Sequence, residues 1–179
     1  QIMIIGIPKE IKEDEFRIAL PPDKIHLLRE NGHNVLVESG AGLGAGIDDE
    51  IYEQAGATLV QGPSQIFSEA EMIVKVKEPQ QEELLRFQKG QILFTYLHLA
   101  AEKEITETLA EKGVTGIAYE TVQLDNGNLP LLAPMSEIAG RLSPQIAAQL
   151  LMKQSNGPGK LIGGVPGVKP CHIVIIGGG

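Results

Sequence analysis

The chain has 179 residues, 42% hydrophobic and 21% charged, so it can bury an ordinary globular core and lacks the composition of a disordered protein. A net charge of -8 and a pI near 5.0 disfavour a nucleic-acid-binding surface, because phosphate backbones attract clustered Lys and Arg. Cys171 is the only cysteine, and no apolar run is long enough to span a membrane. These features predict a cytoplasmic protein that binds neither nucleic acid nor membrane.

Strand-like and helix-like segments alternate along the chain, with short Gly, Pro or Asn turns between them. Such alternation is typical of a parallel sheet wound with helices, and the short β-branched runs are the candidate strands. We therefore predict a doubly wound, mainly parallel α/β fold. The predicted strands are Met3–Ile7, Asn34–Glu38, Thr58–Val60, Met72–Lys77, Gln91–His98, Thr115–Thr121 and His172–Ile176.

Amphipathic segments between these strands predict short crossover helices. One is Pro22–Asn31, and a second is Asp49–Ala55, to which Asp48 offers an N-cap. Two more, Pro79–Gln88 and Glu102–Lys112, each end at a Lys-Gly pair. A cation there suits the helix dipole and the glycine suits the turn that follows.

After Pro134 the sequence predicts one longer helix, Ser136–Gln154. Pro144 lies inside it, and because proline removes a backbone donor we expect a kink there or a division after Ser143. The next segment is rich in Gly and Pro, which predicts a loop leading to the last strand. The apolar stripe of the long helix consists of Ile138, Leu142, Ile146, Leu150 and Leu151.

Three polar residues follow predicted strands at the carboxyl edge of the sheet, where doubly wound proteins bind ligands. Lys77 ends "IVKVK", His98 ends "QILFTYLH", and Arg17 lies in the charged turn after the first strand. Taken singly, each has an ordinary explanation: a solvated strand end, a packed histidine, or an arginine paired with a nearby acid. Together they suit a small carboxylate that carries a carbonyl group. Arg17 and Lys77 would hold the anion and polarise the carbonyl, and His98 would move protons.

Two glycine-rich stretches are candidate phosphate cradles. "GAGLGA" at Gly40–Ala45 matches G-x-G-x-x-A, but the helix signal begins only at Asp48, so the helix would not face a phosphate held at the glycines. We expect this match to be fortuitous. The terminal "VIIGGG" follows a cleaner strand but has no helix after it, and its Gly177 and Gly179 are the candidate cofactor-binding glycines.

Several segments together resemble the amino-terminal half of bacterial alanine dehydrogenases, in order and over nearly the whole chain. They are "GIPKEIKEDEFRIAL", "ESGAGLGAG", "KVKEP", "LFTYLHLAA", "AYETV", "LPLLAPMSEIAGRLS" and "GGVPGVKP". The resemblance implies a flavodoxin-like substrate domain over residues 1–134 and an interdomain helix and loop over 135–171. Residues 172–179 would be the first strand and glycine turn of a truncated Rossmann domain that binds NAD.

The resemblance also implies an activity: reversible NAD-dependent oxidative deamination of L-alanine to pyruvate and ammonia by a homo-oligomer, commonly a hexamer. Arg17 and Lys77 would bind the substrate carboxylate and carbonyl oxygen, and the catalytic residues would be His98, as acid and base, and Lys77. No metal is implied. The remaining implied positions are Tyr96 and Met135 in the pocket, Glu120 near it, and Ser136 with Gly177 and Gly179 at the cofactor.

Two other interpretations stay open. The family's catalytic aspartate has no counterpart in these residues, so the chain alone is expected to be inactive and could be a non-catalytic anion-binding or oligomerisation module. The alpha subunit of nicotinamide nucleotide transhydrogenase resembles the same opening and "ESGAG", but it lacks the equivalents of Lys77 and His98. That pair favours alanine dehydrogenase.

Overall fold

The computed structural model describes residues 2–177, and the chain divides into two compact units, residues 1–122 and 123–179. Among the described residues, every buried side chain lies in the first unit. No helix of this part of the chain is both long and apolar enough to cross a membrane.

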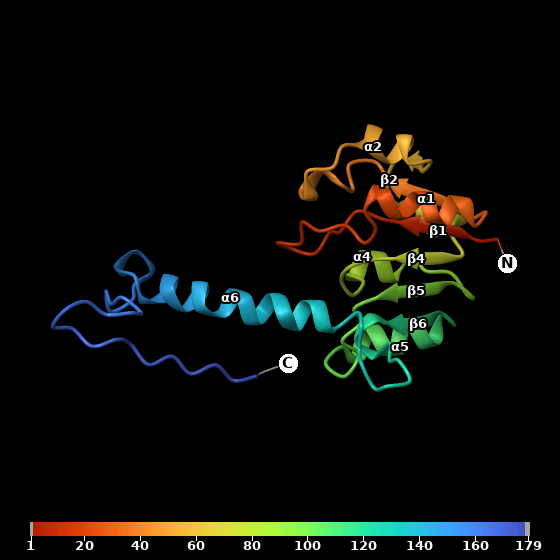
Figure 1. Ribbon diagram of the computed structural model, residues 1–179. Coiled ribbons are helices and arrows are strands. Elements are labelled where there is room, and N and C mark those ends of the chain that lie inside the picture. The colour runs from red at the N-terminus through yellow and green to blue at the C-terminus, as the bar shows by residue number, and fades with distance from the viewer. Residues whose placement is uncertain (1, 178–179) are drawn as a thin grey trace. The chain divides into compact units, whose positions relative to one another are not determined.

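The first unit is built on a six-stranded sheet in the order β3-β2-β1-β4-β5-β6, and every neighbouring pair is parallel (Figure 1). The predicted doubly wound α/β class is therefore confirmed. The strands are β1 (Ile4–Ile7), β2 (Asn34–Glu38), β3 (Thr58–Val60), β4 (Met72–Val74), β5 (Ile92–Thr95) and β6 (Thr115–Ala118).

Strand order reverses between β1 and β4, which pair with each other at the middle of the sheet. With β3 set aside, the other five strands have the flavodoxin order, and β3 extends the edge beyond β2. In such sheets the loops at the reversal diverge to opposite faces and leave a crevice at the carboxyl ends of the strands. The topology thus places the ligand-binding edge where β1 and β4 end.

Five helices connect these strands. Four of them were predicted, and each of these four is shorter in the structure than the predicted range. The fifth, α3, was missed because "PSQIFSE" offers only Ile66 and Phe67 as apolar positions, although Pro63 at its first turn is a helix-start signal. Residues after Glu38 also form a short 3-10 helix, η1 (Leu43–Ala45). The helices are α1 (Pro22–Glu30), α2 (Asp49–Gln54), α3 (Pro63–Glu69), α4 (Gln81–Leu84) and α5 (Lys103–Glu111).

Two apolar clusters cover the faces of the sheet, and β2 shows the division. Val35 and Val37 pack with Ile25 of α1 and Tyr52 of α2, whereas Leu36 belongs to the cluster that α3, α4 and α5 complete. Successive side chains of a strand point to opposite faces, so a continuous apolar run is what a sheet covered on both sides requires. The sheet is therefore packed on both faces.

Three strands, β4, β5 and β6, end earlier than predicted, so the candidate site residues that follow them lie in turns just beyond the strands. β4 ends at Val74 rather than Lys77, and β5 ends at Thr95 rather than His98. β6 ends at Ala118 and continues into a 3-10 turn, η2 (Tyr119–Thr121). Backbone bonding loosens beyond these points, as in the long 3.3 Å bond from the Tyr96 N–H to the Val76 carbonyl.

The second unit contains a 19-residue helix, α6 (Ala133–Leu151), which continues through Pro144 (Figure 1). A division after Ser143 was therefore a wrong expectation. Proline at 144 leaves the Gly140 carbonyl without its usual N–H donor, and the Ser143 hydroxyl donates to that carbonyl at 2.8 Å instead. This replacement bond is a physical reason why the helix is not interrupted.

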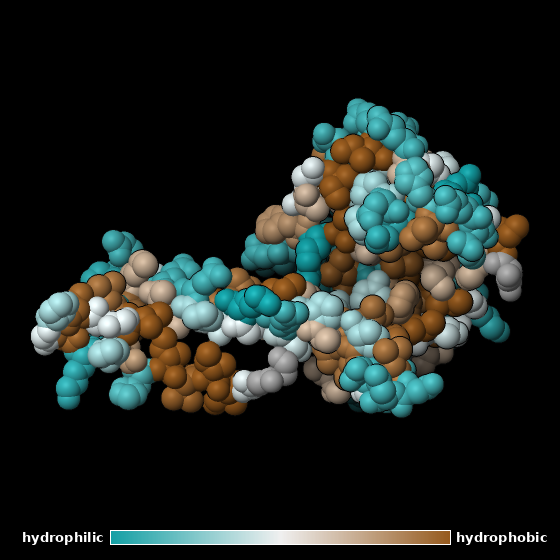
Figure 2. Space-filling view, viewed as in Figure 1, coloured by the Kyte–Doolittle hydropathy of each residue, from teal (hydrophilic) through white to brown (hydrophobic). Residues whose placement is uncertain are grey.

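The rest of the second unit has little regular structure: a 3-10 turn, η3 (Lys153–Ser155), and one bridge between Val165 and Val168. The predicted strand His172–Ile176 is not formed, since no strand among residues 2–177 pairs with this segment. Its apolar side chains are exposed and form a brown group beside the grey end of the chain (Figure 2). Gly177 is described, whereas the candidate Gly179 lies outside the described residues.

Candidate active site

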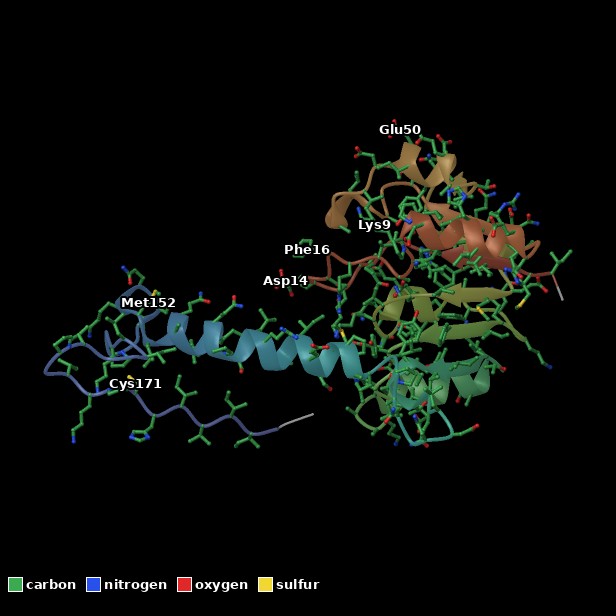
Figure 3. The ribbon with its side chains drawn as sticks, viewed as in Figure 1. Lys9, Asp14, Phe16, Glu50, Met152 and Cys171 are labelled. Atoms are coloured by element: carbon green, nitrogen blue, oxygen red, sulfur yellow. The ribbon has the colours of Figure 1, made fainter. Side chains whose placement is uncertain are left out.

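The carboxyl ends of four adjacent strands bring together most of the candidate residues. Arg17 follows β1, Lys77 follows β4, His98 follows β5 and Glu120 follows β6. Because β1, β4, β5 and β6 are consecutive in a parallel sheet, their following turns share one edge. Figure 3 shows the loop from β1 at this edge, with Lys9, Asp14 and Phe16 labelled on it.

Arg17 is held by its near neighbour Glu15. The guanidinium donates to both carboxylate oxygens, Nε to Oε1 at 2.8 Å and Nη2 to Oε2 at 2.6 Å. The hydrogen bond from Arg17 lowers the pKa of Glu15, and the charge of Lys77 contributes in the same direction. The Glu15 carboxylate that holds Arg17 is therefore also within electrostatic reach of Lys77, and the Arg17 side chain is 46% exposed. The ordinary interpretation, an ion pair with a nearby acid, is also realised.

The backbone of Lys77 is fixed on both sides. Its N–H donates to Glu10 Oε2 at 3.4 Å, and its carbonyl accepts the Thr95 hydroxyl at 2.9 Å. Glu10 Oε1 accepts the Val76 N–H at 2.7 Å, so one carboxylate from the loop after β1 secures the end of β4. The loop that carries Arg17 is thereby joined to the residues that carry Lys77.

A buried ion network supports this junction, and the sequence interpretation missed it. Lys75, whose side chain is 1% exposed, donates to Glu83 at 2.6 Å and to Glu10 at 3.2 Å. Burial raises the pKa of Glu83, while the charge of Lys75 opposes that rise. The signal that could have revealed the network was Lys75 itself, because a lysine inside a doubly covered strand needs acidic partners.

His98 lies on the opposite side of Lys77 from β1, with its ring roughly parallel to Tyr96 at a centroid distance of 6.3 Å and 17° between planes. Tyr96 also packs edge-on against Tyr119 at 4.9 Å. Burial raises the pKa of Tyr96, and the charge of Arg17 opposes the rise, so Arg17 and Tyr96 are electrostatic neighbours. Tyr96 thus connects the arginine to the histidine.

A cavity of about 520 Å³ opens beside His98. Glu120, Ala118 and Thr121 line it, and Arg17 and Lys77 do not. The Glu120 carboxylate accepts the backbone N–H groups of Leu97 and His98, the latter at 2.7 Å. The expectation that Glu120 sits near the pocket rested on resemblance, and the geometry now gives it a specific contact with the histidine.

Four candidate residues belong to the second unit, three of them within the described residues, and their roles stay predictions. The N–H groups of Met135 and Ser136 donate to the Leu132 carbonyl in the first turn of α6. Gly177 has a φ of 118°, and a Cβ added to it would meet no atom within 4 Å. That backbone conformation favours glycine, and the cofactor role of Gly177 stays a prediction.

The alternative glycine stretch is occupied by the protein itself. The Asp49 carboxylate accepts the Gly40 N–H at 2.8 Å and the Ser39 hydroxyl at 2.5 Å. A protein anion therefore already uses the donor that a phosphate would need, which supports the expectation of a fortuitous match. Asp48 occupies the N-cap position of α2 as predicted, but its side chain makes no capping hydrogen bond.

Among the described residues, no group of three or more His, Cys, Asp or Glu side chains could hold a metal ion. The groups gathered at the sheet edge are instead two cations, an imidazole and phenolic rings, with carboxylates that serve mainly to hold them. Such a set can bind a small organic anion, polarise a carbonyl and transfer a proton.

Comparison with known proteins agrees with this chemistry. The family described as Alanine dehydrogenase/PNT, N-terminal domain, matches residues 6–139, and the corresponding C-terminal domain matches 143–179. Alanine dehydrogenases of Methanococcus maripaludis and Bacillus subtilis are 56% and 57% identical over 99% of this chain, which covers 48% and 46% of their lengths. The chain thus spans about half the length of these curated relatives.

Solved structures give the same result. An L-alanine dehydrogenase matches with a TM-score of 0.85 and 56% identity over 94% of this chain and 46% of that one. A transhydrogenase from Sinorhizobium meliloti matches less well, with a TM-score of 0.62 and 32% identity over 65% of this chain and 33% of that one. The chain therefore belongs to the alanine dehydrogenase/PNT family, within which alanine dehydrogenases are its more similar relatives.

Proposed function

We propose that this chain supplies the substrate-binding half of an NAD-dependent alanine dehydrogenase, which converts L-alanine reversibly to pyruvate and ammonia. The observation that carries the proposal is the convergence of Arg17, Lys77 and His98 at the carboxyl edge of adjacent parallel strands. High identity to alanine dehydrogenases along the chain supports it.

In this proposal the two cations divide the substrate between them. Arg17 binds the carboxylate, because a guanidinium offers paired donors that match two carboxylate oxygens. Lys77 donates to the carbonyl oxygen of pyruvate and stabilises the negative charge that develops there when ammonia adds to the carbonyl carbon. The bonds from Glu10 and Thr95 to the Lys77 backbone keep the lysine at a constant distance from the Arg17 loop.

His98 serves as the acid and base. In the direction of deamination, hydride loss leaves an imine on the substrate. His98 would take a proton from the water that adds to the imine carbon and give a proton to the nitrogen, which leaves as ammonia while the carbonyl forms. In the reverse direction the same proton transfers run backward. Tyr96, beside both Arg17 and His98, forms the wall that orients the substrate between them. When bound, NAD accepts the hydride from the substrate carbon.

Cofactor binding is assigned to the second unit. Ser136, at the first turn of α6, would contact the nicotinamide side, and Gly177 with Gly179 would begin the pyrophosphate turn. Met135 would contribute to the pocket. We further propose a homo-oligomer, a hexamer by resemblance, that works in the cytoplasm. Because the chain spans about half the length of its relatives, we expect these 179 residues alone to form negligible NADH from L-alanine.

A second candidate function is a non-catalytic module that binds small anions. It is favoured by one observation: the anion-binding residues Arg17 and Lys77 and the buried core all lie in the first unit, apart from the cofactor candidates. This module would bind pyruvate but would remain inactive even when the remaining half of a related dehydrogenase is joined to it. The proposed dehydrogenase would become active in that fusion.

Calorimetric titration of the 179-residue chain with pyruvate tests the substrate assignment. Arg17→Gln and Lys77→Gln should each weaken binding about tenfold or more, since a hydrogen bond to a charged group contributes about 1.5–3 kcal/mol. Arg141→Gln is the matched control, because Arg141 is an exposed cation of α6 that pairs with Glu137. Unchanged affinity in both site variants would refute the assignment.

A further inference from the structure

His98 has an unusual backbone for its position. Its φ of 50° lies in the left-handed region. Among the described residues, Asp14 and Asn156 are the only other non-glycine residues with a positive φ. This region is uncommon for any residue with a Cβ, although Asn, Asp and His enter it more often than other residues, and it costs free energy that surrounding contacts must offset. Strained backbone that persists at a candidate catalytic residue points to a constraint with a purpose.

The support comes from Glu120. Its Oε1 accepts the His98 N–H at 2.7 Å and the Leu97 N–H at 3.1 Å, while Oε2 lies 3.3 Å from the Leu97 nitrogen. Two consecutive backbone N–H groups therefore converge on one carboxylate, an arrangement that binds anions well. Glu120 comes from η2, immediately after the strand that pairs with β5.

The other backbone group of His98 is also engaged. Its carbonyl accepts the Ala101 N–H at 2.9 Å, so the chain turns away from the sheet directly after the histidine. Leu97, the preceding residue, is buried in the core. His98 thus lies between the buried Leu97 and this turn, and Glu120 accepts its N–H. By fixing the His98 backbone, this bond also sets the direction of the imidazole side chain.

We propose that Glu120 is a positioning residue for His98. Acting through the backbone N–H groups of Leu97 and His98, it keeps the left-handed turn in place, so that the imidazole stays beside Tyr96 and reaches the bound substrate. This role rests on the proposed function, because it presumes a substrate at His98. Glu120 need not touch the substrate, since its carboxylate is already used by the backbone.

The test uses the 179-residue chain labelled with ¹³C at the histidine rings and titrated with pyruvate. In the unaltered chain, pyruvate should move the His98 ring signal. In Glu120→Ala the movement should fall by at least half, while the pyruvate Kd changes less than threefold because Arg17 and Lys77 are intact. Amide hydrogen exchange at Leu97 and His98 should accelerate at least tenfold. A general loss of stability would weaken affinity and ring response together.

Two further variants complete the design. Glu120→Gln keeps one carbonyl acceptor, so it should retain at least half of the ring response while exchange at the two amides rises about threefold. Glu107→Ala is the matched control, because Glu107 is an exposed glutamate of α5 that pairs with Lys103. It should behave like the unaltered chain.

The outcomes separate the two proposals. If pyruvate moves the His98 signal equally in the unaltered chain and in Glu120→Ala, the positioning role is overturned and the substrate assignment stands. If the unaltered chain binds no pyruvate, the proposed function fails and the positioning role fails with it. Should Glu120→Ala not fold, Glu120→Gln decides, and unchanged amide exchange in that variant overturns the role.

Discussion

Lys75 and Lys77 lie two positions apart at the end of one strand, yet their surroundings give them different roles. Lys75 is enclosed with Glu10 and Glu83 and acts within the protein, whereas Lys77 is held by its backbone and its side chain is the one proposed to bind the substrate. Their shared strand face was readable from the sequence. Which of the two was enclosed depended on Glu10, 65 residues away, and no local pattern announces that contact.

Replacing Lys75 tests the enclosed role. Lys75→Met should lower the free energy of unfolding by about 3–5 kcal/mol, because it leaves two buried carboxylates without their cation. Lys103→Met is the matched control: that side chain is 86% exposed, so its removal should change stability by no more than about 0.5 kcal/mol. Urea denaturation followed by circular dichroism measures both. An equal small effect in the two variants would contradict the network's role.

The same variant should respond to pH with a defined sign. Burial raises the pKa of Glu83, so the folded state holds this proton more tightly than the unfolded state does. The resulting stabilisation is present at low pH and is lost as the pH rises through the folded-state value. Without the opposing charge of Lys75 the pKa rises further, so the deficit of Lys75→Met should be smaller at about pH 5 than at about pH 8.

At the scale of elements, continuous apolar runs in the sequence predicted the positions of the strands most reliably. β2 has the predicted bounds Asn34–Glu38, because it is central and apolar throughout its buried stretch. Strand ends were less predictable. In "VKVK" and "FTYLH" the strand-like sequence pattern continues beyond the residues at which β4 and β5 stop pairing as strands. The segment His172–Ile176 has strand composition but no partner, and composition alone does not make a strand.

A substitution at Gly6 of β1 tests how closely α3 packs against the sheet. A Cβ at this position would lie 2.7 Å from Ile66 Cγ2 and 2.8 Å from Ala70 Cβ. Gly6→Ala should therefore lower the free energy of unfolding by about 1–3 kcal/mol through overpacking. Thermal and urea unfolding of the 179-residue chain measure the change.

The control is a glycine in a helix with open space around it. Gly140 of α6 has no atom within 4 Å of an added Cβ, so Gly140→Ala should leave stability unchanged or raise it by up to about 1 kcal/mol. If Gly6→Ala were as harmless as Gly140→Ala, the close contact between β1 and α3 would be contradicted.

At the scale of the whole molecule, the strand order decides where chemistry can occur. Reversal between β1 and β4 places the Arg17 loop and Lys77 on neighbouring strands although they are distant in sequence. Alternation of strands and helices predicted the fold class. The positions of Arg17, Lys77 and His98 after predicted strands indicated that they would lie along one edge of the sheet. The pairing of Glu120 with His98 could not be derived, because it depends on the adjacency of β5 and β6 and on a turn that no residue pattern specifies.

The central claim is that this sheet edge binds the 2-oxo acid, and its most direct test is a map of where pyruvate binds. Backbone amide signals of the ¹⁵N-labelled 179-residue chain would be followed by NMR during a titration with pyruvate. The account predicts the largest shifts at Arg17, Lys77 and His98, with little change over α2. Saturable shifts confined to residues remote from this edge, or none at all, would contradict it.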